Sequence, residues 1–210
     1  IVHYRASKKS TKFIKKNDIF LCDSGGQYKY GTTDVTRTIC FSKQKNSIKN
    51  NFTKVLKGHI AVATTDINKF NTGKKIDRRA RQFLKKDGLD YEHGTGHGVG
   101  FFSNVHEGPQ SITKINTVKL AEGMIVSNEP GYYKKGYYGI RIENLVFIKK
   151  INNKLRFINL TLAPIEKDLI NFSLLNAKEK NYLLKYNLNV YSKISKFLNG
   201  AEKKWLNSLF

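Results

Sequence analysis

Residues 23–38 read DSGGQYKYGTTDVTRT and place two carboxylates, Asp23 and Asp34, eleven positions apart around a glycine-containing turn. If the flanking segments pair as a hairpin centred between Tyr28 and Lys29, the two aspartates lie directly opposite each other. Opposed residues have Cβ atoms about 4.5–5.5 Å apart. Two like charges at that distance are costly unless cations lie between them, so the hairpin predicts a metal site.

A simpler interpretation of Asp23 is that it forms the turn that Ser24 and Gly25 continue, as aspartate often does. This interpretation leaves Asp34 unexplained, because Asp34 lies within a run of β-branched residues typical of a strand. We therefore favour metal binding by the pair of aspartates.

A second stretch, residues 93–109, reads HGTGHGVGFFSNVHEGP and holds three of the five histidines: His93, His97 and His106. A single histidine is more often a core residue than a ligand. Three histidines within a short glycine-rich segment instead indicate a binding site, since glycine lets the backbone approach a ligand closely. The glycines lack the G-x-G-x-x-G spacing of a dinucleotide site.

Two further acidic residues lie in NEPGYY (128–133) and GIRIEN (139–144). Glu129 follows a short apolar segment, where an unpaired carboxylate would be expensive. Glu143 could instead form an ion pair with Arg141, although that pair would not account for the other candidates. Oxygen-rich ligand sets suit hard divalent cations, and one imidazole shifts the preference toward a transition ion. We therefore predict a two-metal hydrolase site with the ligands Asp23, Asp34, His97, Glu129 and Glu143.

The composition is that of a globular chain with a large basic excess. Of 210 residues, 40% are hydrophobic, and 38 Lys and Arg against 16 Asp and Glu give a formal net charge of +22. Such an excess can indicate a polyanionic partner, but without a run of five basic residues we favour a general residue bias over nucleic-acid binding. The sequence contains no segment of 18 apolar residues, so it predicts no membrane span. Cys22 and Cys40 are expected to be buried and unpaired, which favours a reducing, cytoplasmic compartment.

Hydrophobic spacing predicts strands, then two helices, then more strands. This order favours an α+β fold with a mostly antiparallel sheet. The expected strands are residues 18–22, 33–41, 124–126, 139–148 and 155–165, and the expected helices are residues 47–65, a second one built on residues 76–84, and a third from residue 176.

The chain is expected to divide into a main domain, residues 1–165, and a helical C-terminal extension, residues 166–210. The extension carries a stripe of apolar residues that ends before Asn199 and Gly200, and a short helix with Trp205 and Leu206 is expected beyond. The stripe either packs onto its own domain or forms a dimer contact, and both alternatives stay open. Its residues are Leu183, Leu184, Leu188, Tyr191, Ile194, Phe197 and Leu198.

These motifs resemble those of the Xaa-Pro aminopeptidases, the aminopeptidase P family of the pita-bread metallopeptidase superfamily, and most closely its eukaryotic cytosolic members. The resemblance runs from about His3 to the region of Trp205 and rests on LCDSGGQYKYGTTDVTRT, HGTGHGVGFFSNVHEGP and GMIVSNEPGYY in order and spacing. It implies a pita-bread fold, in which helices cover a curved antiparallel sheet. It also implies release of the N-terminal residue from peptides with proline in the second position, with residues 1–165 as the catalytic domain.

The resemblance implies a role for each metal ligand. Asp23 would hold the first metal, and Asp34 would bridge both. His97 and Glu129 would hold the second metal, and Glu143 would also bridge. The family's metal is usually Mn²⁺, with Zn²⁺ or Co²⁺ as alternatives.

Other residues acquire roles by the same resemblance. Glu129 would also move protons, and His93 and His106 would contact the substrate and the developing tetrahedral species. His3 would contact the substrate from the pocket wall. Arg141 would orient the bridging carboxylate.

The resemblance also leads us to expect missing N-terminal domains and defines the alternative functions. Cytosolic members of the family carry two further domains, with additional helices and a strand, before the position of His3. We therefore expect the N-terminal part of the fold to be missing and this span alone to be poorly stable. The apolar stripe of the extension leads us to expect a homodimer through the C-terminal region. A prolidase, a methionine aminopeptidase and a non-catalytic binding module are the alternatives; the run GTGHGVG with NVHEGP and the intact ligand set favour aminopeptidase P.

Overall fold

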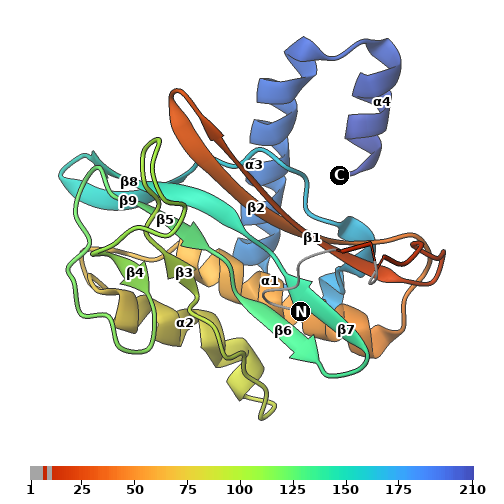
Figure 1. The fold of residues 1–210 in the computed structure, drawn as a ribbon, viewed down its shortest axis with the longest axis horizontal. Coiled ribbons are helices and arrows are strands. Elements are labelled where there is room, and N and C mark those ends of the chain that lie inside the picture. Colours follow the sequence, from red (N-terminus) through yellow and green to blue (C-terminus); the bar gives the residue numbers. More distant parts are fainter. Residues whose placement is uncertain (1–6, 9–10) are drawn as a thin grey trace.

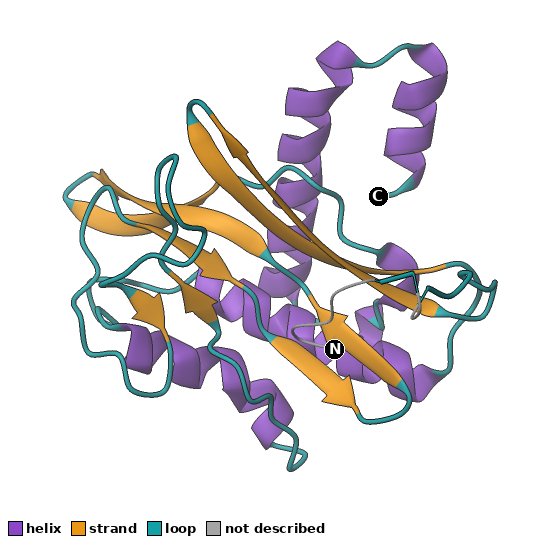
Figure 2. Cartoon of the chain, in the orientation of Figure 1, coloured by secondary structure: helices purple, strands orange, loops and turns teal. Residues whose placement is uncertain are grey.

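The computed structural model of the chain describes residues 7–8 and 11–210, so His3 lies outside the described residues. Within them, short antiparallel sheets adjoin to form a layer of strands that lies over two helices, and two further helices project beyond it (Figures 1 and 2). This is the α+β architecture that the sequence predicts. The strands are β1 (Ile19–Tyr28), β2 (Gly31–Cys40), β3 (Gly96–His97), β4 (Ser111–Ile112), β5 (Ile125–Asn128), β6 (Gly131–Lys134), β7 (Tyr138–Arg141), β8 (Asn144–Ile151) and β9 (Lys154–Asn159).

Four sets of strands make up the layer. β1 pairs with β2, β3 with β4, and β6 with β7, while β8 lies between β5 and β9. Every one of these pairs is antiparallel. The long β1–β2 hairpin crosses the ends of β7 and β8 (Figure 1). This brings the hairpin to the point where the β6–β7 sheet meets the β5–β8–β9 sheet.

The helices lie close to where the hydrophobic spacing predicts them. Asn176 and Asn199 each begin a helix with a capping box, in which the asparagine side chain and a glutamate three residues later satisfy each other's backbone amides. The α-helices are α1 (Asn46–Ala63), α2 (Gly73–Lys85), α3 (Ala177–Ile194) and α4 (Gly200–Ser208), with short 3₁₀ helices at Lys167–Leu169, Phe172–Leu174 and Ser195–Phe197.

Helix α1 organises the interior because its residues enter two hydrophobic clusters. Phe52, Leu56 and Ile60 pack in a cluster that reaches β7 and the C-terminal helices. Val62, at the end of the helix, joins a second cluster with α2, β5 and β8. The strands above are therefore fixed relative to one helix, which gives the site a rigid base.

The apolar stripe of α3 is divided between two environments. Within the predicted stripe, Leu183 is buried and Tyr191, Ile194 and Leu198 are partly buried against the core cluster of the main domain. Leu184, Leu188 and Phe197 are more than half exposed. Packing onto its own domain is therefore confirmed for one side of the helix. The homodimer expected through this region stays a prediction.

The hairpin forms, but its register differs from the prediction by two residues. Tyr28 pairs with Gly31, so Asp23 lies opposite Thr36, and Asp34 lies opposite Gly25. The prediction was wrong because Lys29 and Tyr30 form the turn, so the centre of the hairpin lies one residue later than predicted, and each residue of β1 pairs two positions further along β2.

The expected strand 139–148 is two strands, β7 and β8. Between them the chain changes partner: the Ile142 amide donates to Pro130 at 3.4 Å, and the Glu143 amide donates to Thr36 of β2 at 3.1 Å. Alternating hydrophobicity continues through such a break, which explains the error. The expected strand 155–165 also ends early, at Asn159.

The cysteines are unpaired, as predicted, but neither of them is fully buried. Cys22 lies opposite Arg37 and Cys40 opposite Ile19, and both thiols are free. Cys22 is exposed and Cys40 is only partly buried, so the expectation that both are buried was wrong.

Close packing of α1 on α2 gives a first prediction. A Cβ added at Gly58 would lie 2.6 Å from the Ala80 carbonyl oxygen, whereas one added at Gly200 would meet nothing within 4 Å. We expect Gly58→Ala to lower the free energy of unfolding by about 1–3 kcal/mol. Gly200→Ala should leave it unchanged or raise it slightly. Denaturant unfolding of both variants is the measurement, and equal effects would contradict this account of the helix contact.

Candidate metal centre

The five predicted ligands come from five separate segments and face one pocket of about 260 Å³. Asp23 and Asp34 project from the hairpin, His97 from β3, Glu129 from the end of β5, and Glu143 from the break between β7 and β8. The pocket is lined by Asp23, Asp34, His93, Gly94, Gly96, His97, His106, Ser111, Thr113, Glu129, Arg141 and Glu143.

The corrected register still leaves the two aspartates on one face of the hairpin. Asp34 and Thr36 are two residues apart on β2 and so point the same way, and Asp23 lies opposite Thr36. The aspartates are therefore diagonal neighbours, whose Cα atoms are typically about 7–8 Å apart, rather than directly opposed.

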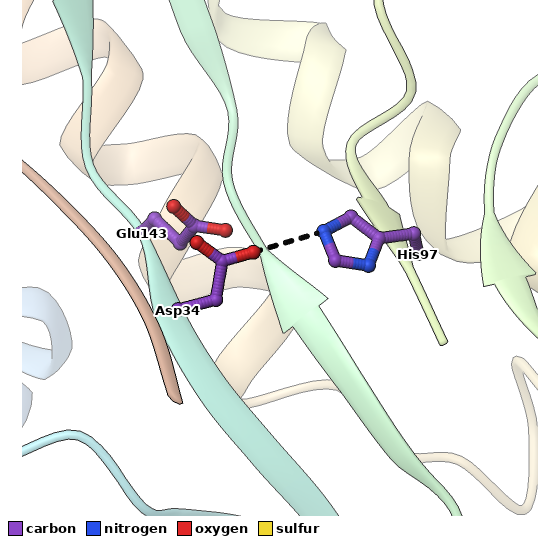
Figure 3. A group of neighbouring side chains, drawn as sticks. All are labelled: Asp34, His97 and Glu143. Atoms are coloured by element: carbon purple, nitrogen blue, oxygen red, sulfur yellow. Dashed lines mark ion pairs between the residues drawn. The ribbon is translucent and has the colours of Figure 1, made fainter. Parts of the chain in front are cut away.

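Three ligands meet most closely. Ligand atoms of Asp34, His97 and Glu143 all lie within 4.8 Å of one another, and Figure 3 shows the three side chains converging. The His97 Nε2 atom is 3.3 Å from Asp34 Oδ2 and 3.3 Å from Glu129 Oε1. Glu129 therefore adjoins this group through the same imidazole.

Close strand contact fixes the orientation of the imidazole. A Cβ on Gly96 would lie 2.0 Å from the Ser127 carbonyl oxygen, so glycine allows β3 to lie against β5. The His97 Nδ1 atom lies 2.9 Å from the Gly98 carbonyl and must carry the proton, because a carbonyl only accepts. The Nε2 atom is thereby directed at the carboxylates, as a metal ligand requires.

Neighbouring side chains hold three of the carboxylates. Glu129 accepts a hydrogen bond from the Ser127 hydroxyl at 3.0 Å. Glu143 accepts one from Thr36 at 2.6 Å. Asp23 accepts one from Arg141 and is the most exposed of the set, with a side chain that is 44% accessible.

Arg141 serves different partners from those predicted. Its guanidinium contacts Asp23, lies 3.8 Å from Glu129, and donates to the Thr36 and Tyr133 hydroxyls at 3.0 and 2.9 Å. It reaches the predicted bridging ligand Glu143 only through Thr36. The reason is the strand break after Arg141, which makes side-chain direction there impossible to deduce from alternation.

Burial and crowding of like charges shift the pKa values of the ligands. Burial raises the pKa of Glu143 to about 8, and the charges of Glu129 and Asp34 add to the rise. Burial likewise raises the pKa of Glu129, against the opposing effects of His97 and Arg141. For His97, burial lowers the pKa, but the contacts with Asp34, Gly98 and Glu129 outweigh it and raise the pKa to about 9.

This donor set fits divalent cations. Carboxylates that repel one another share a pocket with one imidazole. The His97 Nε2 atom faces these carboxylates, and in the protonated ring its proton lies where the nitrogen lone pair would otherwise point at a cation. A bound cation would replace that proton and neutralise the carboxylates, so metal binding would release protons. Oxygen ligands with a single imidazole suit Mn²⁺ and its neighbours among the transition ions.

The other two predicted histidines lie beside the ligands. The His93 Nδ1–H donates to the Gly94 carbonyl at 2.7 Å, and its Nε2 atom lies 2.9 Å from the Tyr133 hydroxyl. The His106 ring lies 4.1 Å from the His97 ring, measured between centroids. Both line the pocket, as a substrate contact would require.

Two residues important for this arrangement were not foreseen. Thr36 lies between Glu143 and Arg141: its hydroxyl donates to the Glu143 carboxylate and accepts from the Arg141 guanidinium. Arg37, on the other face of β2, donates to the Glu143 main-chain carbonyl at 2.6 Å and to the Tyr186 hydroxyl of α3 at 3.0 Å. Their place in the TRT run next to Asp34 was the available signal, but their partners lie more than 100 residues away.

The family of the chain follows from its sequence matches. Residues 1–150 match the model of metallopeptidase family M24, and residues 153–208 match that of the C-terminal region of peptidase M24. The first match covers more than half of the chain, so the chain belongs to metallopeptidase family M24. The α+β fold class and the family resemblance are thus confirmed, while the domain boundary at residue 165 stays a prediction.

Relatives agree with this assignment. A probable Xaa-Pro aminopeptidase P of Coprinopsis cinerea is 47% identical over 219 residues, covering 98% of this chain and 35% of that protein. One of Laccaria bicolor is 46% identical, covering 98% and 34%. The chain therefore spans about a third of the length of the curated relatives it matches.

Solved structures show the same similarity. An X-prolyl aminopeptidase from Caenorhabditis elegans, described as a cytosolic enzyme with a di-nuclear active site, matches with a TM-score of 0.92 and 38% identity, covering 99% of this chain and 36% of that one. A prolidase from Pyrococcus horikoshii matches with a TM-score of 0.65 and 31% identity, covering 77% and 44%. Among the described residues, no helix has the length and apolar content needed to cross a membrane.

The raised pKa of Glu143 predicts a pH-dependent cost in the metal-free protein. The pKa is about 8 in the fold against an ordinary 4.5, so the stability that protonated Glu143 contributes is complete below about pH 4.5 and is lost as the pH rises through 8. Glu143→Gln keeps an acceptor for Thr36 and removes the charge. We expect it to raise the free energy of unfolding at pH 8 by at least about 1 kcal/mol, since one pKa unit corresponds to about 1.4 kcal/mol.

Chemical unfolding with a chelator present, from pH 5 to 8, measures this effect. The advantage of Glu143→Gln should grow with pH, and added Mn²⁺ should stabilise the variant less than the wild type. Asp168→Asn, which neutralises an exposed carboxylate, is the charge-matched control and should show neither change. A variant no more stable than wild type at pH 8 would contradict the assigned cost.

Proposed function

We propose that this chain is the catalytic part of a dinuclear metal-dependent aminopeptidase that releases the N-terminal residue from peptides with proline in the second position. The observation that carries the proposal is the convergence of Asp34, His97 and Glu143 within 4.8 Å. The named activity of the relatives supports the substrate class. Because the chain spans only about a third of those relatives, the activity of the whole protein is part of the proposal.

The ligands divide between two cations in this proposal. Asp23 would hold one, His97 and Glu129 the other, and Asp34 and Glu143 would face both. Mn²⁺ is the expected ion, with Zn²⁺ or Co²⁺ as alternatives. When bound, such a pair supplies an activated water and polarises the carbonyl that the water attacks.

The chain's own residues would position the substrate and move the proton. Glu129, held by Ser127, is the proposed proton carrier, which would accept a proton from water and return it to the leaving amine. His93 and His106 line the same pocket and are the proposed substrate contacts. His93 is held toward the pocket by the Tyr133 hydroxyl.

Proline explains why such an enzyme needs a dedicated pocket. A proline nitrogen carries no N–H, so a peptide cannot be aligned at that residue by main-chain pairing as a strand. The substrate must instead be located by its free amino terminus and by side-chain contacts. An acidic pocket lined by histidines, as found here, suits a positively charged amino terminus.

Two further properties belong to the proposal. A cytoplasmic location is supported by the description of the nematode relative as a cytosolic enzyme and by the free cysteines. A homodimer is supported by the exposed apolar residues of the C-terminal region, including Leu184, Leu188 and Trp205, within the proposed extension 166–210.

Peptide hydrolysis tests the function. The full-length protein, stripped of metal and reloaded with Mn²⁺, should release the first residue from an Xaa-Pro-Yaa tripeptide and not from an Xaa-Ala-Yaa control. Asp34→Asn should reduce kcat/KM by more than about a hundredfold, because even partners of metal ligands typically contribute 10–100-fold. Asp168→Asn should leave kcat/KM unchanged.

Other results would select an alternative. Cleavage of Xaa-Pro dipeptides alone would indicate a prolidase, and removal of methionine before small residues would indicate a methionine aminopeptidase. No Mn²⁺-dependent hydrolysis by folded protein, together with salt-sensitive nucleic-acid binding, would replace the enzyme with a binding module.

A further inference from the structure

His59 is a fully buried histidine in the C-terminal part of α1, outside the metal pocket. Its Nδ1 atom lies 3.1 Å from the Asn128 carbonyl oxygen and 3.2 Å from the Ile142 carbonyl oxygen. Carbonyls only accept hydrogen bonds, so Nδ1 carries the proton and donates to both. Asn128 and Ile142 directly precede the ligands Glu129 and Glu143.

The two carbonyls mark a gap in the ladder between neighbouring strands. The β5–β8 pairing ends at Asn128 and Asn144, and the β6–β7 pairing resumes at Gly131 and Arg141. Both glutamates lie inside this gap. Their backbone amides turn away from each other, because Glu129 donates to Thr95 and Glu143 donates to Thr36.

Little else holds the two strands together across the gap. Pro130 has no N–H to offer, and the bond from the Ile142 amide to the Pro130 carbonyl is long, at 3.4 Å. The His59 ring therefore supplies, from the helix below, a donor shared by the two strands where their own ladder is interrupted.

A second bond makes this link reciprocal. The Asn128 side-chain amide donates to the His59 main-chain carbonyl at 2.9 Å. The helix and the end of β5 thus exchange hydrogen bonds in both directions. Both residues are fully buried, so water does not compete for these bonds.

The histidine is an expensive residue for this position. His59 Nε2 and Asn128 Oδ1 are buried without a hydrogen-bond partner among the described residues, and such atoms typically cost about 1–3 kcal/mol each. Burial lowers the pKa of His59 to about 3, so the ring stays neutral. An apolar side chain would avoid the unpaired nitrogen, which indicates that the Nδ1 donor has a use beyond packing.

We infer that His59 is a positioning residue of the metal centre, whose shared Nδ1–H sets the separation of Glu129 and Glu143 by holding the carbonyls before them. The inference rests on the proposed metal site. It assigns the spacing of two ligands on different strands to a helix residue that touches neither the ligands nor the pocket.

Three substitutions separate this role from core packing. Asparagine places its amide nitrogen where His59 has Nδ1, two bonds beyond Cβ, whereas glutamine reaches toward the position of Nε2. Leucine fills space and donates nothing. We expect His59→Asn to keep Mn²⁺ affinity within about threefold of wild type, and His59→Gln and His59→Leu to lose about 10–100-fold, as for other partners of metal ligands.

Mn²⁺ binding to the full-length protein is measured by titration calorimetry, and the electron paramagnetic resonance signal of coupled Mn²⁺ pairs reports the ion spacing. Unfolding in chelator controls for folding. The coupled signal should be retained in His59→Asn and be weakened in His59→Gln at equal Mn²⁺ occupancy. If His59→Leu fails to fold, the comparison of His59→Asn with His59→Gln still distinguishes a positioning role from core packing.

The outcomes distinguish this inference from the proposed function. Equal Mn²⁺ affinity and coupling in all variants, or equal losses in His59→Asn and His59→Gln, would overturn the inference while leaving the enzyme intact. Wild-type protein that binds no Mn²⁺ pair would overturn both. A coupled pair that depends on His59 in a protein that cleaves no Xaa-Pro peptide would support the inference and overturn the proposed substrate.

Discussion

The structure depends on holding mutually repelling carboxylates close together in a partly buried pocket. Asp34, Glu129 and Glu143 raise one another's electrostatic energy, and burial adds to the cost. The surroundings offset part of this repulsion: His97 lies between Asp34 and Glu129, and Arg141 also lies near Glu129. The same repulsion would favour a divalent cation, so in the proposed function the energetic cost of the site would also be the origin of its affinity.

The fold meets this constraint by bringing ligands from separate sheets over a single helix. No one sheet carries the whole set. The hairpin, β3 and the gap between β5–β8 and β6–β7 each contribute, and α1 packs beneath their junction. Interrupting the ladder at Glu129 and Glu143 lets both side chains face the pocket. It also leaves backbone groups to be satisfied from elsewhere, which Thr95, Thr36 and His59 do. Ligand geometry is thereby set by tertiary contacts rather than by strand pairing.

The C-terminal region is connected to the metal centre through polar contacts as well as apolar packing. Tyr186 of α3 bonds Arg37, whose guanidinium donates to the main chain of Glu143. Burial lowers the pKa of Arg37, but nearby Tyr186 and Glu143 oppose the effect. The partly buried guanidinium of Arg37 thus lies behind the carboxylate cluster and links two segments that match separate family models. Removing the Tyr186 hydroxyl would disturb the backbone of a ligand from a distance.

The sequence by itself determined the family, the α+β class and the approximate positions of the main helices, and it singled out the residues that we propose as ligands. It could do so because ligand chemistry, helical periodicity and capping asparagines are local properties that neighbouring residues express. Only the tertiary structure decided the hairpin register, the strand break at Glu143, the partners of Arg141 and the position of His59. Each depends on which distant backbone groups pair, and alternation of apolar residues carries no information about partners. From the sequence alone, His59 is predicted to be an ordinary core residue. Only the structure shows that the carbonyls of Asn128 and Ile142 converge on its ring.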